Sequence, residues 1–264
     1  MPYANNDGVK IYYEVEGQGP PLVLAHGGGG SLGDWRKFGF VVPLKQDFEL
    51  ILFDARGHGQ SDKPHGPTDY GLQMADDVVA VLDDLRIRRA CYFGYSMAAR
   101  TGFWLATRHA ERFICFILGG TAPKYPETES EIKAETNITE SALKTMRLSP
   151  QDRLSEREKQ LGRTLTPEEK QMLLLNDMKA LIAMRTSRAV YPRLTNRDLS
   201  LISAPCLLYA GDLDAMFYAG CKESAGLLPR TTFFSLAGFD HAAAYKQSDL
   251  VLPHIKKFLA EVKS

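Results

Sequence analysis

The segment with the clearest chemical potential places a serine between a strand and a helix. The apolar stretch Ala90–Phe93 predicts a buried strand, and Ser96 follows it directly. Gly94 and Ala98 flank this serine with small side chains. A sharp strand-to-helix turn of this kind presents the hydroxyl at the carboxyl end of the strand and at the N-terminus of the helix. The pattern therefore predicts a nucleophile at Ser96, and a serine that merely caps the helix is the alternative.

A serine hydroxyl needs a base to become a good nucleophile, and the base needs an acid to orient it. Both residue types occur later in the chain, each just after an apolar strand. Asp214 follows the strand Cys206–Ala210, and His241 follows the strand Thr231–Ser235. Parallel strands end at the same edge of a sheet, so we expect the three side chains to meet there. The order Ser, Asp, His along the chain matches one class of catalytic triad and differs from the trypsin-like and subtilisin-like orders.

Four consecutive glycines, Gly27–Gly30, follow His26 and the apolar strand Leu22–Ala25. Glycines let backbone N–H groups point into a pocket without obstruction by side chains. Acyl transfer requires such donors for the oxyanion, and the N–H of Met97 would supply a second one. A phosphate-binding loop is the competing interpretation, but the run lacks the Gly-x-Gly-x-x-Gly pattern and no Gly-Lys-Ser/Thr follows it.

Short apolar strands alternate with helical patterns along most of the chain. Helical stretches such as Leu72–Leu85 separate the apolar runs, which read as buried parallel strands. This alternation predicts an α/β fold with a mostly parallel sheet. We interpret the turn Asp54–Asp62, which contains His58 and follows the strand Leu50–Phe53, as structural.

Residues 124–198 break this alternation. They contain 14 Lys or Arg, 12 Asp or Glu and only one glycine, Gly162. Tight turns between strands and helices need glycine, whereas antiparallel helices do not, so we expect a helical insertion here. Thr166 and Pro167 predict a helix start. An apolar stripe at helical spacing follows, formed by Leu174, Met178, Leu181 and Ile182. It suggests packing onto the main domain, which consists of 1–123 and 199–264, and a ligand-facing surface is the alternative.

Composition limits the partners of this 264-residue chain. It has 32 Lys or Arg and 32 Asp or Glu, so it lacks the basic surplus typical of nucleic-acid binding or of attachment to anionic membranes. No apolar run approaches the length of about 20 residues that a membrane helix needs. Four dispersed cysteines and no visible signal peptide favour the cytoplasm. We therefore expect a small-molecule substrate and catalysis by side chains, without a metal or cofactor; the oligomeric state is left open.

These segments together resemble the α/β-hydrolase fold superfamily, and in particular its small serine hydrolases with a helical cap. The resemblance rests on five segments in the expected order: His26–Gly29, Asp54–Ser61, Gly94–Ala98, Gly211–Asp214 and Asp240–His241. It spans nearly the whole chain and departs from the usual pattern at Ala98, where the turn around the nucleophile commonly has glycine. It implies an eight-stranded sheet flanked by helices and a cap inserted after the sixth strand.

The resemblance also implies roles for individual residues. Ser96 would be the nucleophile, His241 the base and Asp214, rather than Asp212, the acid. The amides of Gly28 and Met97 would form the oxyanion hole. We further expect substrate contacts from Gly27, Gly29, Trp35 and Tyr95. The Ser at position 96 argues against epoxide hydrolases and haloalkane dehalogenases, which use an Asp nucleophile.

The predicted reaction is hydrolysis of a small carboxylic ester or lactone. Carbon–carbon bond hydrolysis of a diketone acid and a non-catalytic ligand-binding protein of the same fold remain the alternatives. The carbon–carbon reaction calls for an arginine that binds a carboxylate. Arg100 on the helix after Ser96 is expected to face solvent or a neighbouring acid, and the mixed-charge stretch Arg153–Arg163 is expected to be a solvated face. A neutral ester or lactone is therefore the simpler expectation.

Overall fold

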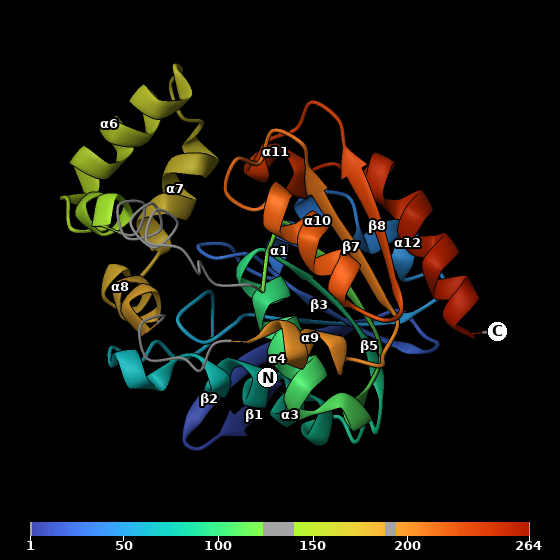
Figure 1. The fold of residues 1–264 in the computed structure, drawn as a ribbon. Helices are drawn as coiled ribbons and strands as arrows, with labels where there is room; N and C mark the ends of the chain where they lie inside the picture. The colour runs from blue at the N-terminus through green and yellow to red at the C-terminus, as the bar shows by residue number, and fades with distance from the viewer. Residues whose placement is uncertain (1, 124–139, 188–193, 264) are drawn as a thin grey trace.

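An eight-stranded sheet forms the centre of the molecule (Figure 1). The computed structural model of the chain describes residues 2–123, 140–187 and 194–263. The strand order is β1-β2-β4-β3-β5-β6-β7-β8, and all neighbours are parallel except β1–β2 and β2–β4. The predicted mostly parallel α/β sheet is confirmed. The strands are β1 (Tyr3–Asn6), β2 (Val9–Glu16), β3 (Pro21–Ala25), β4 (Glu49–Phe53), β5 (Ala90–Tyr95), β6 (Phe113–Gly119), β7 (Cys206–Gly211) and β8 (Thr231–Leu236).

Each face of the sheet is covered by its own hydrophobic layer. Along β3, Val23 belongs to one layer, whereas Leu22 and Leu24 belong to the other. Continuous apolar strands result, because both faces are buried. The first layer contains residues of α3 (Leu72–Asp84), α4 (Met97–Arg108) and α10 (Tyr218–Leu227). The second contains residues of α1 (Gly33–Lys37), α2 (Val41–Leu44), α11 (His241–Tyr245) and α12 (Ser248–Lys263).

Strand β1 lies outside the strands expected from the sequence. It pairs with β2 through a two-residue turn in which Asp7 has φ 49° and Gly8 has φ 86°. Two consecutive residues with positive φ, of the types Asp and Gly, are typical of a tight β-hairpin. The hairpin extends the sheet at the edge remote from β8.

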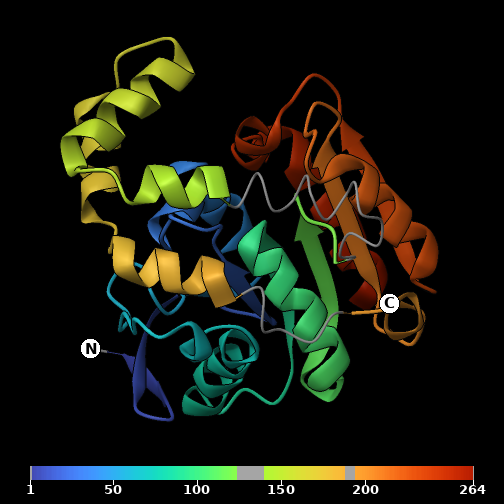
Figure 2. The same ribbon diagram turned by 60° about the vertical axis from the view of Figure 1, so that its left-hand side comes forward.

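Helices also lie between β6 and β7 (Figures 1 and 2), and the last two of them contribute Ala180, Ala183 and Leu199 to the first hydrophobic layer. They are α6 (Pro150–Leu161), α7 (Pro167–Leu175) and α8 (Met178–Ser187), followed by the short α9 (Asn196–Ser200). Thr166 caps α7 as the sequence predicts: its side chain accepts from the N–H of Glu169, whose carboxylate accepts from the N–H of Thr166. Of the expected insertion 124–198, the parts 124–139 and 188–193 lie outside the described residues.

The apolar stripe expected along one helix is divided between two. Helix α7 ends at Leu175, and α8 begins at Met178. Asp177 causes the break, because its Oδ1 accepts from the backbone N–H groups of Lys179 and Ala180 and so starts a new helix. Leu174 is exposed. The expectation of one continuous stripe was therefore wrong.

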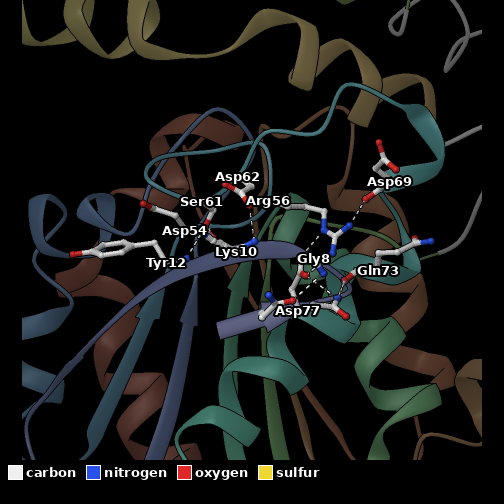
Figure 3. Close-up of polar contacts among 12 residues, drawn as sticks. Gly8, Lys10, Tyr12, Asp54, Arg56, Ser61, Asp62, Asp69, Gln73 and Asp77 are labelled. Atoms are coloured by element: carbon white, nitrogen blue, oxygen red, sulfur yellow. Dashed lines mark hydrogen bonds and ion pairs between the residues drawn. The ribbon is translucent and has the colours of Figure 1, made fainter. Parts of the chain in front are cut away.

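The turn Asp54–Asp62 is bound into the fold by buried polar contacts (Figure 3). Arg56 donates to both carboxylate oxygens of Asp77 on α3, at 2.6 and 2.5 Å, and both side chains are buried. Ser61 Oγ donates to the carbonyl of Asp54 and accepts from the N–H of Tyr12 on β2. These bonds agree with the structural interpretation of this turn. None of the helices in the described ranges is long and apolar enough to cross a lipid bilayer.

Candidate active site

Ser96 occupies a strained turn between β5 and α4. Its φ is 54° and its ψ is −110°, in a region that side chains with a Cβ rarely adopt. The turn is compact because Gly94 lies against α4: a Cβ at Gly94 would come within 2.7 Å of the carbonyl carbon of Ala98. The methyl group of Ala98, where glycine is usual, is buried in the first hydrophobic layer. Ala98 is thus compatible with the turn, since Gly94 provides the close approach.

The structure brings Ser96, His241 and Asp214 into one hydrogen-bonded chain. Nε2 of His241 lies 2.9 Å from Oγ of Ser96, and Nδ1 lies 2.7 Å from Oδ2 of Asp214. Asp214 is buried, whereas the His241 side chain is 35% exposed. A carboxylate at Nδ1 holds the proton on that nitrogen and leaves Nε2 able to accept the serine proton. Each residue follows the end of a parallel strand, which brings the three side chains to one edge of the sheet.

The two aspartates after β7 have different surroundings. The second oxygen of Asp214, Oδ1, accepts from the N–H groups of Met216 and Phe217, which fixes the carboxylate toward His241. Asp212 is exposed, and its Oδ1 accepts from the N–H of Gly238 at 2.7 Å. Asp212 therefore joins two loops at this edge, while Asp214 contacts the imidazole.

Two tyrosines support His241 from the core side. Tyr95 donates its hydroxyl proton to the carbonyl of His241 at 2.6 Å, and its ring stacks on that of Tyr245 with the centroids 4.3 Å apart. Tyr95 also lines the pocket above Ser96. Tyr245 was not anticipated, because only the packing of α11 against β5 brings it there.

The glycine loop, Gly27–Gly30, lies beside the nucleophile. A Cβ on Gly27 would be 3.7 Å from Cβ of Ser96, and a Cβ on Gly28 would be 3.7 Å from Cβ of Met97. In the described part of the chain, the N–H groups of Gly28 and Met97 have no backbone acceptor. Both donors therefore remain available to a ligand next to Ser96.

Two side chains from distant segments hold Gly29. Its N–H donates to Nε2 of His58 at 2.9 Å, and its carbonyl accepts from Nδ2 of Asn176 at 3.0 Å. Asn176 follows α7, so this bond joins the helical insertion to the glycine loop. The sequence carries no signal for the contact with Asn176, since nothing in the pattern relates the end of α7 to the loop.

His58 and His26 are fully buried and neutral. Burial lowers the pKa of His26 to about 4 and that of His58 to about 3, and the nearby His26 contributes to the second shift. In each ring Nε2 accepts from a backbone N–H and Nδ1 faces a backbone carbonyl, which assigns the proton to Nδ1. These histidines fasten the glycine loop to the turn after β4, and neither contacts Ser96.

A pocket of about 320 Å³ surrounds Ser96 and His241. Its lining includes Tyr95 and the whole glycine loop, as expected for Gly27, Gly28 and Gly29. Trp35, however, does not line the pocket. It is completely buried and its ring packs against Phe40 and Phe93, because α1 turns it toward the second hydrophobic layer. The expectation that Trp35 contacts the substrate was therefore wrong.

Arg100 also lies away from this pocket. It borders a separate recess of about 40 Å³ that Met97, Trp104 and Met184 also line. Its side chain is half-buried rather than fully solvated. Arg100 is thus poorly placed to contact a ligand bound at Ser96.

The chain is similar in sequence to proteins of the alpha/beta hydrolase fold. The sequence profile of the alpha/beta hydrolase fold family matches residues 20–137, a range that includes the glycine loop and Ser96. The curated 3-oxoadipate enol-lactonase 2 of Acinetobacter baylyi is 36% identical over 125 residues, which are 46% of this chain and 45% of that protein. The match thus spans less than half the length of this relative.

Solved structures resemble the chain over nearly its whole length. Est816, described as an N-acyl homoserine lactone degrading enzyme, aligns with a TM-score of 0.74 and 26% identity, covering 97% of this chain and 100% of that one. The enol-lactonase from Burkholderia xenovorans aligns with a TM-score of 0.75 and 26% identity, covering 98% and 100%. These matches include the helices between β6 and β7 as well as the sheet.

Proposed function

The chain belongs to the α/β-hydrolase fold superfamily, and we propose that it is a serine hydrolase of small carboxylic esters or lactones. The observation that carries this proposal is the continuous hydrogen-bonded chain from Ser96 through His241 to Asp214. The relatives described as lactone-cleaving enzymes support the same class of reaction. We also propose that 124–198 act as a cap over a core formed by 1–123 and 199–264.

The proposed reaction proceeds in two steps through an acyl-enzyme. Oγ of Ser96 attacks the carbonyl carbon while Nε2 of His241 takes its proton, and Asp214 stabilises the imidazolium that forms. The N–H groups of Gly28 and Met97 would bind the oxyanion. His241 then gives its proton to the leaving alkoxide, which departs as an alcohol. In the second step His241 takes a proton from water, the water oxygen attacks the acyl carbon, and Ser96 recovers its proton as the acid leaves.

An organophosphonate probe with a fluorescent tag tests this proposal without knowledge of the substrate. We expect rapid labelling of Ser96 in the native protein and none after Ser96→Ala, because only an activated serine reacts quickly. Absence of labelling would indicate a non-catalytic ligand-binding protein. Kinetics on aryl esters, an enol-lactone and a vinylogous diketone acid would then separate the reactions: a kcat/KM far higher for the diketone acid would replace ester hydrolysis by carbon–carbon cleavage.

A further inference from the structure

A second cavity, lined by three arginines, adjoins the Ser96 pocket. It has a volume of about 890 Å³ and shares Arg157 and part of the glycine loop with that pocket. Arg153 and Arg157 come from α6, and Arg185 comes from α8 on another side of the cavity. Among the described residues that line it there is no Asp or Glu. Arg153 and Arg157 therefore border this space with no carboxylate in its described lining.

The two arginines of α6 make hydrogen bonds to neutral groups. Nη1 of Arg153 donates to the carbonyl of Leu148 at 2.9 Å, and Nη1 of Arg157 donates to Oε1 of Gln160 at 3.4 Å. Their spacing of four positions puts two like charges on one helix face, an arrangement that weakens an isolated helix. Within the described ranges neither forms an ion pair. Arg157 is exposed, as the sequence suggested for this stretch, whereas Arg153 is half-buried. Both arginines border the cavity.

Two other cations nearby, Arg163 and Lys170, are already paired with carboxylates. Arg163, which lines the Ser96 pocket, donates to both carboxylate oxygens of Glu169 at 2.9 and 2.8 Å. Glu158 of α6 pairs with Lys170 at 3.1 Å. Asp34 also lines the Ser96 pocket, and burial raises the pKa of its carboxyl group. Arg153 and Arg157 thus differ from Arg163 and Lys170 in having no carboxylate partner among the described residues.

The remaining lining of the second cavity is largely apolar. It suits a carbon skeleton that extends from the reacting bond at Ser96 toward the arginines. The apolar side chains are Ala142, Met146, Leu173, Met178, Leu181 and Met216.

We propose that the substrate carries a carboxylate, which Arg153 and Arg157 bind in this cavity while its ester or lactone bond lies at Ser96. This inference rests on the proposed function and replaces the neutral ester or lactone expected from the sequence by an anionic one. A guanidinium group matches the geometry of a carboxylate and binds it through two parallel hydrogen bonds. Arg157 borders both spaces, so a small molecule can contact it and Ser96 together.

Two pairs of matched esters test the proposal and locate the carboxylate. The first pair places the charge on the acyl side: mono-p-nitrophenyl glutarate against p-nitrophenyl pentanoate. The second places it on the alcohol side: para-acetoxybenzoate against para-acetoxybenzamide. In at least one pair we expect kcat/KM to be about tenfold higher for the anionic ester, and we expect Arg157→Gln and Arg153→Gln to abolish that preference. Equal kcat/KM values for the anionic and the neutral ester in both pairs would overturn the proposal. So would arginine variants in which kcat/KM falls by the same factor for the anionic and the neutral ester.

Arg163→Gln is the matched control, because Arg163 lines the adjoining Ser96 pocket but is paired with Glu169. It should leave the preference for the anionic ester intact.

Calorimetric titration of glutarate into the Ser96→Ala protein separates this inference from the proposed reaction. Glutarate binding that Arg157→Gln removes, together with a native protein that hydrolyses none of these esters, would retain the carboxylate site and reject the hydrolase. Hydrolysis without charge preference and without glutarate binding would retain the hydrolase and reject the site.

Discussion

Oγ of Ser96 lies 2.9 Å from Nε2 of His241, although 145 positions of sequence separate the two residues. The contact arises because β5 and β8 are parallel strands of one sheet, and each residue follows the carboxyl end of its strand. Both residues therefore lie close together in space, because each is just beyond the end of a strand in the same parallel sheet.

Ser96→Ala should abolish turnover and leave the fold intact. Loss of a triad nucleophile costs on the order of 10⁶ in rate. The hydroxyl faces the pocket, so we expect the free energy of unfolding to change by less than about 0.5 kcal/mol. Steady-state kinetics and denaturant unfolding measure the two effects. Ser235→Ala, at an exposed serine on β8, is the control and should keep full activity. A Ser96→Ala protein with a tenth of the native activity would disprove the nucleophile.

Asp214→Asn should lower kcat far more than Asp212→Asn. The Asp214 carboxylate holds the His241 imidazole at 2.7 Å, and an amide there would favour the wrong tautomer, a change that costs about 10⁴ in a comparable triad. Asp212 only accepts from the N–H of Gly238, so its replacement should affect loop stability more than catalysis. Parallel kinetics on the two variants decide the assignment, and the opposite ranking would transfer the acid's role to Asp212.

Much of this site was predictable from local pattern. Ser96, Asp214 and His241 each follow a strand that the sequence predicts. Because these strands are parallel, their carboxyl ends lie at one edge of the sheet, and the three side chains meet there. Trp35 was misplaced because its distance along the chain from the glycine loop says nothing about which face of α1 it occupies. The bond between Asn176 and Gly29 joins positions 147 apart and depends on where α7 ends, which residue types alone do not determine.

Gly94→Ala should destabilise the protein and displace Ser96. The new Cβ would lie within 2.7–2.9 Å of backbone atoms of Ala98 and Ala99, so α4 must move away from β5. Overpacking of this kind costs about 1–3 kcal/mol. The midpoint temperature of thermal unfolding and the rate of organophosphonate labelling should both decrease. Gly226→Ala is the matched control: Gly226 lies on α10 with open space around its Cα, and alanine there should stabilise the helix by about 0.5–1 kcal/mol. Unchanged stability of Gly94→Ala would contradict the described packing.

The free energy of unfolding should decrease as the pH falls below about 6.5, the ordinary pKa of histidine. In the folded protein the pKa of His26 is about 4 and that of His58 about 3, so between these values and 6.5 the unfolded chain holds more protons. Each unit of pH then costs on the order of 1 kcal/mol of stability per histidine, and the loss is complete below the folded values. Denaturant unfolding at several pH values measures this slope.

His58→Gln provides the control for this pH dependence. A glutamine amide can still accept from the N–H of Gly29 and donate to the carbonyl of Arg56, but it does not titrate. The slope between pH 4 and 6 should therefore be about half of the native one. The same slope in both proteins would show that His58 does not bind its proton on unfolding.

Asn176→Ala should slow the acylation of Ser96 by loosening the glycine loop. Nδ2 of Asn176 holds the carbonyl of Gly29 at 3.0 Å, and the N–H of the preceding residue, Gly28, is the proposed oxyanion donor. Removing an oxyanion donor costs about 10²–10³ in kcat, so misaligning one should cost less, about tenfold. The rate of organophosphonate labelling reports this step directly, and kcat should fall with little change in KM.

His65→Ala is the matched control. His65 contacts Asp177, the residue after Asn176, at 3.0 Å and so also joins the insertion to the core. It does not contact the glycine loop. If both variants lose the same rate, the effect belongs to attachment of the insertion as a whole. The other outcome is that His65→Ala is labelled at the native rate, whereas Asn176→Ala and Asn176→Asp are labelled equally slowly. Since an aspartate cannot donate to the carbonyl, this outcome would show that the hydrogen bond to Gly29 itself positions the oxyanion hole.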